Sequence, residues 1–237
     1  MKLNEFNKQR TEELNGNLKA VVFDMDGLMF NTEWLIKYCW DVTGKEMGYD
    51  NFGDNIYNTL GMNYNRRREY FLDKYGKDFD FEGFTDRYRE VSADYLAKNG
   101  TPVKKGLINI LEFLKENGIK MAVATSSSRK YAMSKIESVG IAGYFDTIIC
   151  GDMVTKSKPD PQIYKMACDG LSVDYASCIA FEDSPNGIRS AYAAGMNPIM
   201  IPDLLADAPE EVEEMLVAKL EDLDEAVEFL KKEIYKR

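Results

Sequence analysis

Four short apolar runs, each followed by polar or charged side chains, constrain the fold of this chain most strongly. Their length and their content of Val, Ile, Phe and Ala are typical of buried β-strands. The runs are residues 19–23, 119–124, 147–150 and 178–181. The carboxyl ends of parallel strands meet at one edge of an open sheet, where ligands bind. We therefore expect the residues that follow these runs, although far apart in sequence, to gather at one place.

The side chains predicted to meet there suit metal-assisted phosphoryl transfer. They are four carboxylates, one hydroxyl and one ammonium, from Asp24, Asp26, Glu182, Asp183, Thr125 and Lys158. Two carboxylates about 4 Å apart repel each other by roughly 4 kcal/mol at an effective dielectric near 20, so such a cluster needs a cation. Ser184 and Pro185 already supply the cap of the next helix, so Glu182 and Asp183 have no structural duty there and a metal site is favoured.

The composition narrows both the metal and the class of partner. The chain has 237 residues, a formal net charge of -10 and no histidine. Without histidine, acid–base work falls mainly to carboxylates, and a site made only of oxygen atoms favours magnesium, manganese or calcium. The negative charge argues against a nucleic-acid partner, because no basic patch is present to neutralise phosphates.

The sequence shows no sign of membrane insertion or export. No apolar stretch approaches the roughly 18 to 20 residues needed to cross a bilayer. Residues 1–17 lack the apolar segment of a secretory signal, so the cytoplasm is the expected location and a monomer the expected state. The four cysteines form no C-x-x-C pattern, and we expect buried free thiols.

The pattern of strand and helix signals changes along the chain. From residue 101 onward the two alternate, which predicts an α/β fold with a doubly wound, Rossmann-like parallel sheet. Residues 32–100 show aromatic-rich helical patterns and no convincing strand. Because the strand at 19–23 must join the later sheet, we interpret this stretch as an inserted all-helical cap domain. The predicted parts are a core of residues 18–31 and 101–237, a cap of residues 32–100, and a frayed or loosely docked N-terminal extension of residues 1–17.

The Asp-x-Asp pattern is weak evidence by itself, because it occurs three times. The pairs at 78/80 and 222/224 lie in polar or amphipathic segments and are most simply solvated surface. Only the pair at 24/26 follows a strand and precedes a glycine, Gly27, that can form a sharp turn. Thr125 is ambiguous in a similar way, since the four hydroxyl residues that it begins could cap a helix, bind an anion, or do both.

In chain order, four motifs resemble those of the haloacid dehalogenase-like hydrolases. They are Asp24-Met-Asp26-Gly27, Thr125, Lys158-Pro159 and Glu182-Asp183-Ser184. The similarity covers roughly residues 18–203. It is closest to the branch with an α-helical cap after the first motif, which includes β-phosphoglucomutase and many small-molecule phosphatases. The segments 158–164 and 181–188 resemble that branch strongly.

The resemblance implies a catalytic role for each matching residue. Asp24 would be the nucleophile that attacks phosphorus and forms an aspartyl-phosphate. Asp26 would protonate the leaving oxygen and later activate water. Thr125 would hydrogen-bond the transferring phosphoryl group, and Lys158 would neutralise charge on it and on Asp24.

The resemblance also implies the cofactor, Mg²⁺. Asp24, the backbone carbonyl of Asp26, and Asp183 would hold the ion, with Glu182 in support. These implied roles agree with general chemistry, because phosphoryl transfer depends mostly on positioning and on stabilisation of charge.

The leading hypothesis is a Mg²⁺-dependent phosphatase of small phosphate monoesters, such as sugar phosphates. The alternative is a sugar-phosphate mutase similar to β-phosphoglucomutase. That mutase carries a cap histidine where this chain has Ile36, and a cap arginine near the position of residues 61–65, whereas Arg66 comes slightly later. A non-enzymatic phospho-receiver is a third reading, but receivers are about half as long and lack a cap. Asp26 speaks against phosphonate cleavage and dehalogenation.

Substrate contacts are harder to predict than the reacting groups. The substrate-binding candidates are Ser126, Asn31 and Arg66. Asn31 stands where the family often has aspartate. The cap aromatics Trp34, Tyr38 and Tyr64 could face a substrate or simply build the core of a helical bundle.

Overall fold

The computed structural model describes residues 12–59, 62, 64–204 and 208–234. Within these residues it contains a six-stranded sheet, ordered β3-β2-β1-β4-β5-β6, in which every neighbouring pair is parallel. The strands are β1 Ala20–Phe23, β2 Lys120–Thr125, β3 Thr147–Cys150, β4 Cys178–Glu182, β5 Asn197–Met200 and β6 Ala218–Lys219. The predicted doubly wound parallel sheet is confirmed.

The register of the central strands brings their ends to one level. Phe23, the last residue of β1, pairs with Val123 of β2 and with Phe181 of β4. Asp24, which follows Phe23, therefore lies level with Glu182, the last residue of β4. The carboxyl ends of β1, β2 and β4 form one edge of the sheet.

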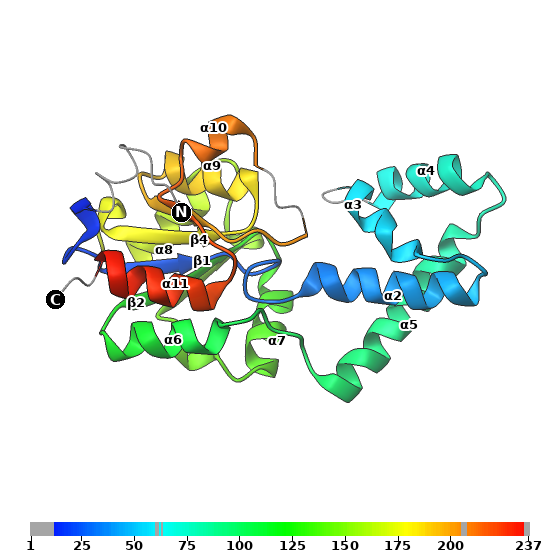
Figure 1. Cartoon of the computed structure of the whole chain (residues 1–237), viewed down its shortest axis with the longest axis horizontal. Coiled ribbons are helices and arrows are strands. Elements are labelled where there is room, and N and C mark those ends of the chain that lie inside the picture. The colour runs from blue at the N-terminus through cyan, green and yellow to red at the C-terminus, as the bar shows by residue number, and fades with distance from the viewer. Residues whose placement is uncertain (1–11, 60–61, 63, 205–207, 235–237) are drawn as a thin grey trace. The chain divides into compact units, whose positions relative to one another are not determined.

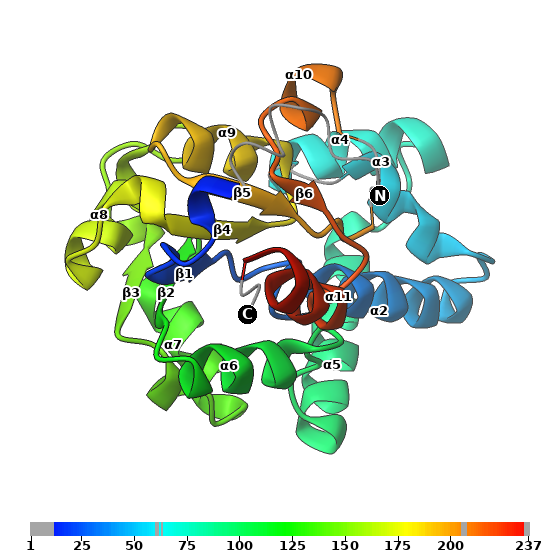
Figure 2. The same cartoon turned by 60° about the vertical axis from the view of Figure 1, so that its left-hand side comes forward.

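Helices cover both faces of the sheet, because strand side chains alternate between the faces (Figures 1 and 2). Val21 and Phe23 pack into the same apolar core as α6, α7 and α11, whereas Ala20 and Val22 pack with α8 and α9. The longer helices are α6 Leu107–Glu116, α7 Arg129–Ser138, α8 Gln162–Leu171, α9 Pro185–Ala193 and α11 Leu223–Phe229. The shorter ones are η2 Ala142–Tyr144, η3 Gly151–Met153, η4 Tyr175–Ser177, α10 Glu210–Glu213 and the π-helix η5 Leu230–Ile234.

The chain divides into two compact units, Met1–Asn31 with Val103–Arg237, and Thr32–Pro102. The described residues of the second unit form helices joined by turns and loops, with no strand among them. Its helices are α2 Thr32–Glu46, η1 Phe52–Asn55, α3 Ile56–Thr59, α4 Tyr64–Tyr75 and α5 Phe81–Asn99. The all-helical insertion that the sequence predicted is therefore present.

Aromatic side chains build the interior of the helical unit. Trp40 and Phe71 are fully buried with their ring centroids 5.4 Å apart, and Phe52 stacks on Phe71 at 5.3 Å. By contrast, Trp34 and Tyr38 are 41% and 40% exposed. The bundle therefore uses other rings for its core and leaves these two accessible.

The two other Asp-x-Asp pairs have structural duties that the sequence did not reveal. Asp80 accepts a hydrogen bond from the backbone N–H of Gly83 at 2.9 Å and caps the N-terminus of α5. Asp222 accepts one from the N–H of Glu225 at 2.9 Å and caps α11. Both capping bonds lie at the surface, as expected, and Asp80 and Asp222 each satisfy a helix-end donor in addition.

The N-terminal segment is packed more firmly than expected where the structure describes it. Residues 1–11 lie outside the described residues, but residues 12–14 are helical. Leu14 and Leu18 are 1% and 5% exposed and belong to the main apolar core. For residues 12–17 the expectation of a frayed or loosely docked extension is wrong, because Leu14 is packed into the core. Separately, the described helices include none long and apolar enough to cross a membrane.

We predict that Leu14→Ala lowers the free energy of unfolding by about 2 to 4 kcal/mol, because it leaves a cavity in the core. The measurement is urea unfolding of the variant beside the wild type. Glu12→Ala, two residues earlier at an exposed position, is the control and should change stability by less than about 0.5 kcal/mol. Equal, small effects of the two substitutions would contradict the packing of Leu14.

Candidate functional site

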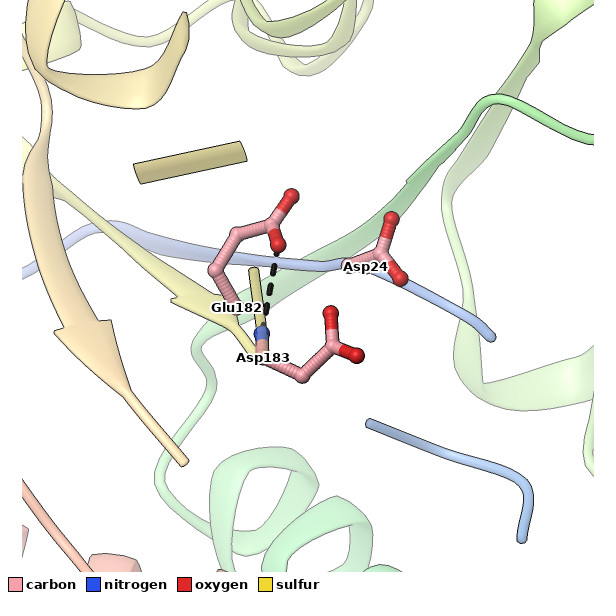
Figure 3. Close-up of side chains that lie close together, drawn as sticks. All are labelled: Asp24, Glu182 and Asp183. Atoms are coloured by element: carbon pink, nitrogen blue, oxygen red, sulfur yellow. Dashed lines mark hydrogen bonds between the residues drawn. The ribbon is translucent and has the colours of Figure 1, made fainter. Parts of the chain in front are cut away.

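Three carboxylates meet at the carboxyl edge of the central strands. Asp24 follows β1, and its backbone N–H donates to the carbonyl oxygen of Phe181 in β4 at 2.9 Å. One oxygen each of Asp24, Glu182 and Asp183 lies within 4.8 Å of the others. The carboxylate of Asp183 is turned toward that of Asp24 (Figure 3). The predicted meeting of the first Asp-x-Asp pair with the later acidic pair is thus realised for Asp24.

Lys158, in the loop between η3 and α8, binds two of these carboxylates. Its ammonium donates to Asp24 Oδ1 at 2.5 Å, to Glu182 Oε1 at 2.6 Å and to the carbonyl oxygen of Ala124 at 3.0 Å. The side chain is only 7% exposed. A buried ammonium with three acceptors of this kind is held in one position.

Tyr164 of α8 completes this buried network, and the sequence did not identify it. Its hydroxyl donates to Glu182 Oε1 at 2.6 Å, and the ring lies under the Lys158 ammonium with 5.0 Å to the centroid. Burial, followed by the charge of Glu182, raises the pKa of Tyr164 well above its usual value, so the hydroxyl keeps its proton. Its place six residues after Lys158, in the first turn of α8, was the available signal.

Glu182 is engaged on both oxygens. Besides Lys158 and Tyr164 on Oε1, Oε2 accepts from the Ser184 hydroxyl at 3.1 Å and from the Asp183 N–H at 3.2 Å. Gly187 lies so close that a Cβ there would overlap the carboxylate. Glu182 is therefore placed to orient its neighbours.

Burial has opposite consequences for the two ends of the ion pair. Burial raises the pKa of Asp24 to about 7, although the charge of Lys158 opposes the rise. Burial by itself would lower the pKa of Lys158, but the charges of Asp24 and Glu182 outweigh it and raise that pKa above the ordinary value. The site thus holds a cationic lysine beside a carboxyl group that resists losing its proton without a further positive charge.

Asp26 lies apart from this group, and a serine holds its side chain. The Ser127 hydroxyl donates to Asp26 Oδ2 at 2.7 Å. Burial raises the pKa of Asp26, and this hydrogen bond works in the opposite direction. A carboxyl group with a raised pKa keeps its proton to higher pH than an ordinary aspartate, which suits a group that gives and takes protons. Ser127 belongs to the hydroxyl run seen in the sequence, but the pattern alone did not distinguish it from its neighbours.

Thr125 ends β2 and is almost fully buried, at 1% exposed. Its Oγ1 accepts a hydrogen bond from the Ser127 N–H at 3.0 Å, which shapes the turn into α7. The first N–H of α7, at Arg129, donates instead to the carboxylate of Asp152 at 3.0 Å. The cap of this helix therefore comes from Asp152, and the suggested capping duty of Thr125 at Arg129 is not observed.

The substrate-binding candidates are spread over different surroundings. Asn31 donates from Nδ2 to the carbonyl oxygen of Val103 at 3.0 Å, which gives it a structural task at the point where the chain returns to the first unit. Ser126 is exposed next to the site loop, and Arg66 is exposed on α4 of the helical unit. These positions leave all three as candidates, with Asn31 already committed to one backbone contact.

The donor set fits a hard divalent cation. The clustered ligand atoms are carboxylate oxygens, and magnesium and calcium prefer oxygen. Gly27 adopts a φ of 85°, and a Cβ at that position would overlap Asp183 Oδ2, so glycine allows the acidic side chain to approach the first loop. Asp24 and Asp183 would hold the ion, with Glu182 supporting them.

A family profile described as "Haloacid dehalogenase-like hydrolase" matches residues 21–201. The Phosphorylated carbohydrates phosphatase of Thermotoga maritima is 30% identical over 186 residues, which cover 77% of this chain and 84% of that protein. The matched region of the profile includes every carboxylate and the lysine of the site.

Solved structures show the same architecture. A Thermotoga maritima protein, provisionally named a beta-phosphoglucomutase, superposes with a TM-score of 0.75 at 27% identity and covers 91% of this chain and 99% of that one. CbbY from Rhodobacter sphaeroides, solved in complex with phosphate, superposes with a TM-score of 0.62 at 26% identity and covers 88% and 96%.

The raised pKa of Asp24 predicts how stability depends on pH when divalent ions are removed by a chelator. A carboxyl group with a higher pKa in the folded state than its usual 3.8 binds its proton more tightly there, so its contribution to stability falls as pH rises from about 4 to about 7. We therefore compare the unfolding free energy of metal-free Asp24→Asn with that of the wild type at each pH. We expect the difference to favour the variant more at pH 8 than at pH 5, by on the order of 1 kcal/mol or more.

The measurement is urea unfolding of the wild type and the variant at both pH values. Asp78→Asn, at an exposed position, controls for the loss of one carboxylate. A stability difference between wild type and Asp24→Asn that does not change with pH would show that Asp24 has an ordinary titration in the fold.

Proposed function

Because this chain belongs to the haloacid dehalogenase-like hydrolases, we propose that it is a Mg²⁺-dependent phosphatase of small phosphate monoesters, with Asp24 as the nucleophile. The observation that carries the proposal is the contact of Asp24 with a buried ammonium, close to a second acid, Asp183, at the carboxyl edge of the sheet. Sugar phosphates are the favoured class, because the Thermotoga maritima relative is named for phosphorylated carbohydrates.

In the first step a carboxylate oxygen of Asp24 forms a bond to phosphorus, and the bond from phosphorus to the ester oxygen breaks. Asp26 gives its proton to the departing alcohol. The raised pKa of Asp26 supports this role, because the acid must carry a proton when the substrate arrives. The product of this step is an aspartyl-phosphate, which divides the hydrolysis into two easier reactions.

In the second step Asp26, now a carboxylate, takes a proton from a water molecule that attacks the phosphorus. The bond between phosphorus and the Asp24 oxygen breaks, and inorganic phosphate leaves. The hydrogen bond from Ser127 orients the Asp26 carboxyl group for both transfers. Each group returns to its starting protonation state at the end of the cycle.

Charge stabilisation falls to Lys158 and Thr125. Lys158 touches Asp24 directly and would neutralise charge on the nucleophile and the transferring group. Thr125 Oγ1 accepts from a backbone N–H, so its hydroxyl proton can be directed at a phosphoryl oxygen. When bound by Asp24, Asp183 and the Asp26 carbonyl, Mg²⁺ supplies positive charge to the phosphoryl oxygens.

The mutase remains the second candidate, because one structural relative carries the name of a beta-phosphoglucomutase. The absence of histidine from the sequence, with Ile36 at the position of the mutase's cap histidine, argues for water rather than a sugar hydroxyl as the final acceptor. In this proposal the helical unit selects the substrate as a cap, with Ser126, Asn31 and Arg66 among the contacts. The enzyme acts as a monomer in the cytoplasm.

The test is phosphate release from a panel of sugar phosphates, nucleotides and an aryl phosphate, with Mg²⁺ and with a chelator. We expect metal-dependent turnover that Asp24→Asn abolishes and Asp26→Asn lowers by about 10²- to 10⁴-fold. Asp78→Asn serves as the control and should leave turnover unchanged.

Normal turnover by Asp24→Asn would eliminate the proposed nucleophile. Conversion of glucose 1-phosphate to glucose 6-phosphate without net release of phosphate would instead select the mutase.

A further inference from the structure

Asp203, in the loop after β5, carries a buried oxygen without a hydrogen-bond donor. Its side chain is only 7% exposed. Oδ1 forms an ion pair with the ammonium of Lys104, whereas Oδ2 is buried and accepts no hydrogen bond within the structure as described. A buried carboxylate oxygen left unpaired is costly, by about 1 to 3 kcal/mol or more. A hydrogen-bond donor or a cation from outside the protein would therefore stabilise this oxygen.

The unpaired oxygen lies beside the candidate metal site. A Cβ placed on Gly27 would overlap Asp183 Oδ2 and would lie 3.3 Å from Asp203 Oδ2. Both carboxylate oxygens therefore border the same small space next to the turn that follows Asp24 and Asp26. The unpaired Oδ2 of Asp203, buried beside a second carboxylate, attracts a cation or a molecule that carries hydrogen-bond donors.

Asp203 is not placed as a direct ligand of the same ion. Among the described residues, the group whose carboxylate oxygens lie within 4.8 Å of one another consists of Asp24, Glu182 and Asp183. Mg²⁺ usually keeps several of its water molecules when a protein binds it through one or two carboxylates. Such water molecules donate hydrogen bonds to nearby acceptors. Asp203 Oδ2 lies close to the ligand oxygens but outside their group, where such an acceptor is expected.

Lys104 fixes the Asp203 carboxylate in this orientation. Its backbone N–H donates to the carbonyl oxygen of Met29 at 2.9 Å, so Lys104 is tied to the loop that contains the first Asp-x-Asp pair. Its side chain is 16% exposed, and its ammonium is paired with Oδ1 of Asp203. The ion pair thus leaves only Oδ2 for the space beside Gly27.

We propose that Asp203 is a positioning residue of the metal site, whose Oδ2 accepts a hydrogen bond from a water molecule on the divalent ion held by Asp24 and Asp183. This inference rests on the proposed function, since it requires the ion. Asp203 then selects the hydrated form of a small cation and orients its water molecules, while Lys104 neutralises the remaining charge.

The test is the affinity for Mg²⁺, measured by isothermal titration calorimetry on the full chain freed of metal. Asp203→Asn keeps the shape of the side chain but can turn an amide N–H₂ toward the site. We expect Mg²⁺ binding to weaken by about 10- to 100-fold, the range found when groups that orient a metal's ligands are replaced. Asp222→Asn removes the same charge from a carboxylate paired with Lys105 at 2.6 Å and should leave the affinity within about twofold.

A second variant covers the case in which Asp203→Asn fails to fold because Lys104 is left buried without its partner. The double variant Lys104→Gln with Asp203→Asn removes the ion pair as a unit and preserves the net charge, which is far less disruptive. It should also lose Mg²⁺ affinity. Lys104→Gln alone retains the acceptor and should weaken binding less than Asp203→Asn does.

The outcomes separate this inference from the proposed function. Wild-type affinity in the double variant, or equal losses in Lys104→Gln and Asp203→Asn, would assign Asp203 to the ion pair only and overturn the inference, while the phosphatase proposal stands. A wild-type chain that hydrolyses phosphate esters without binding Mg²⁺ would overturn the metal part of both.

Discussion

The buried ion pair of Lys158 with Asp24 and Glu182 is the interaction on which the site depends. The ammonium lies 2.5 Å from Asp24 Oδ1 and 2.6 Å from Glu182 Oε1, in a region closed to solvent. Without it, two buried carboxylates would face each other in a medium of low dielectric, where their repulsion is large. One ammonium faces the two carboxylates of Asp24 and Glu182, so the same constraint that builds the site leaves it with more acidic groups than cations.

The fold creates this situation through topology. β1 lies in the middle of the sheet with β2 and β4 as neighbours, and all of them end at the same edge. The residues that follow them are consequently forced together, and only the polar network around Lys158 makes that arrangement tolerable. Small side chains at the edge have a related role, because Gly27 and Gly187 leave room for the carboxylates of Asp183 and Glu182.

Much of the fold and the centre of the site could be predicted from the sequence. Apolar runs that end in acids mark buried strands, and parallel strands must end on one edge, so the convergence of Asp24 with Glu182 and Asp183 required only the alternation of strands and helices. Lys158 could be predicted for the same reason, because the loop after β3 begins at that edge of the sheet. The sheet and the helical insertion followed from patterns that depend on many residues at once.

The contacts that depend on the direction of one side chain could not be predicted. Ser127 rather than another hydroxyl of its run reaches Asp26, and Tyr164 reaches Glu182 from within a helix that reads as ordinary core. The side-chain amide of Asn31 donates a hydrogen bond to the carbonyl oxygen of Val103. Asp203 carries no motif at all, and only its burial together with an unpaired oxygen sets it apart. Side-chain rotamers and loop conformations decide such contacts, and hydrophobic periodicity predicts neither of them.

The most direct measurement is the anomalous diffraction of Mn²⁺ in crystals grown with the ion, since manganese takes the oxygen ligands of magnesium and can be located by its own signal. We expect a peak in contact with carboxylate oxygens of both Asp24 and Asp183. A peak bound elsewhere, or an ion that touches neither aspartate, would show that these carboxylates do not form the metal site.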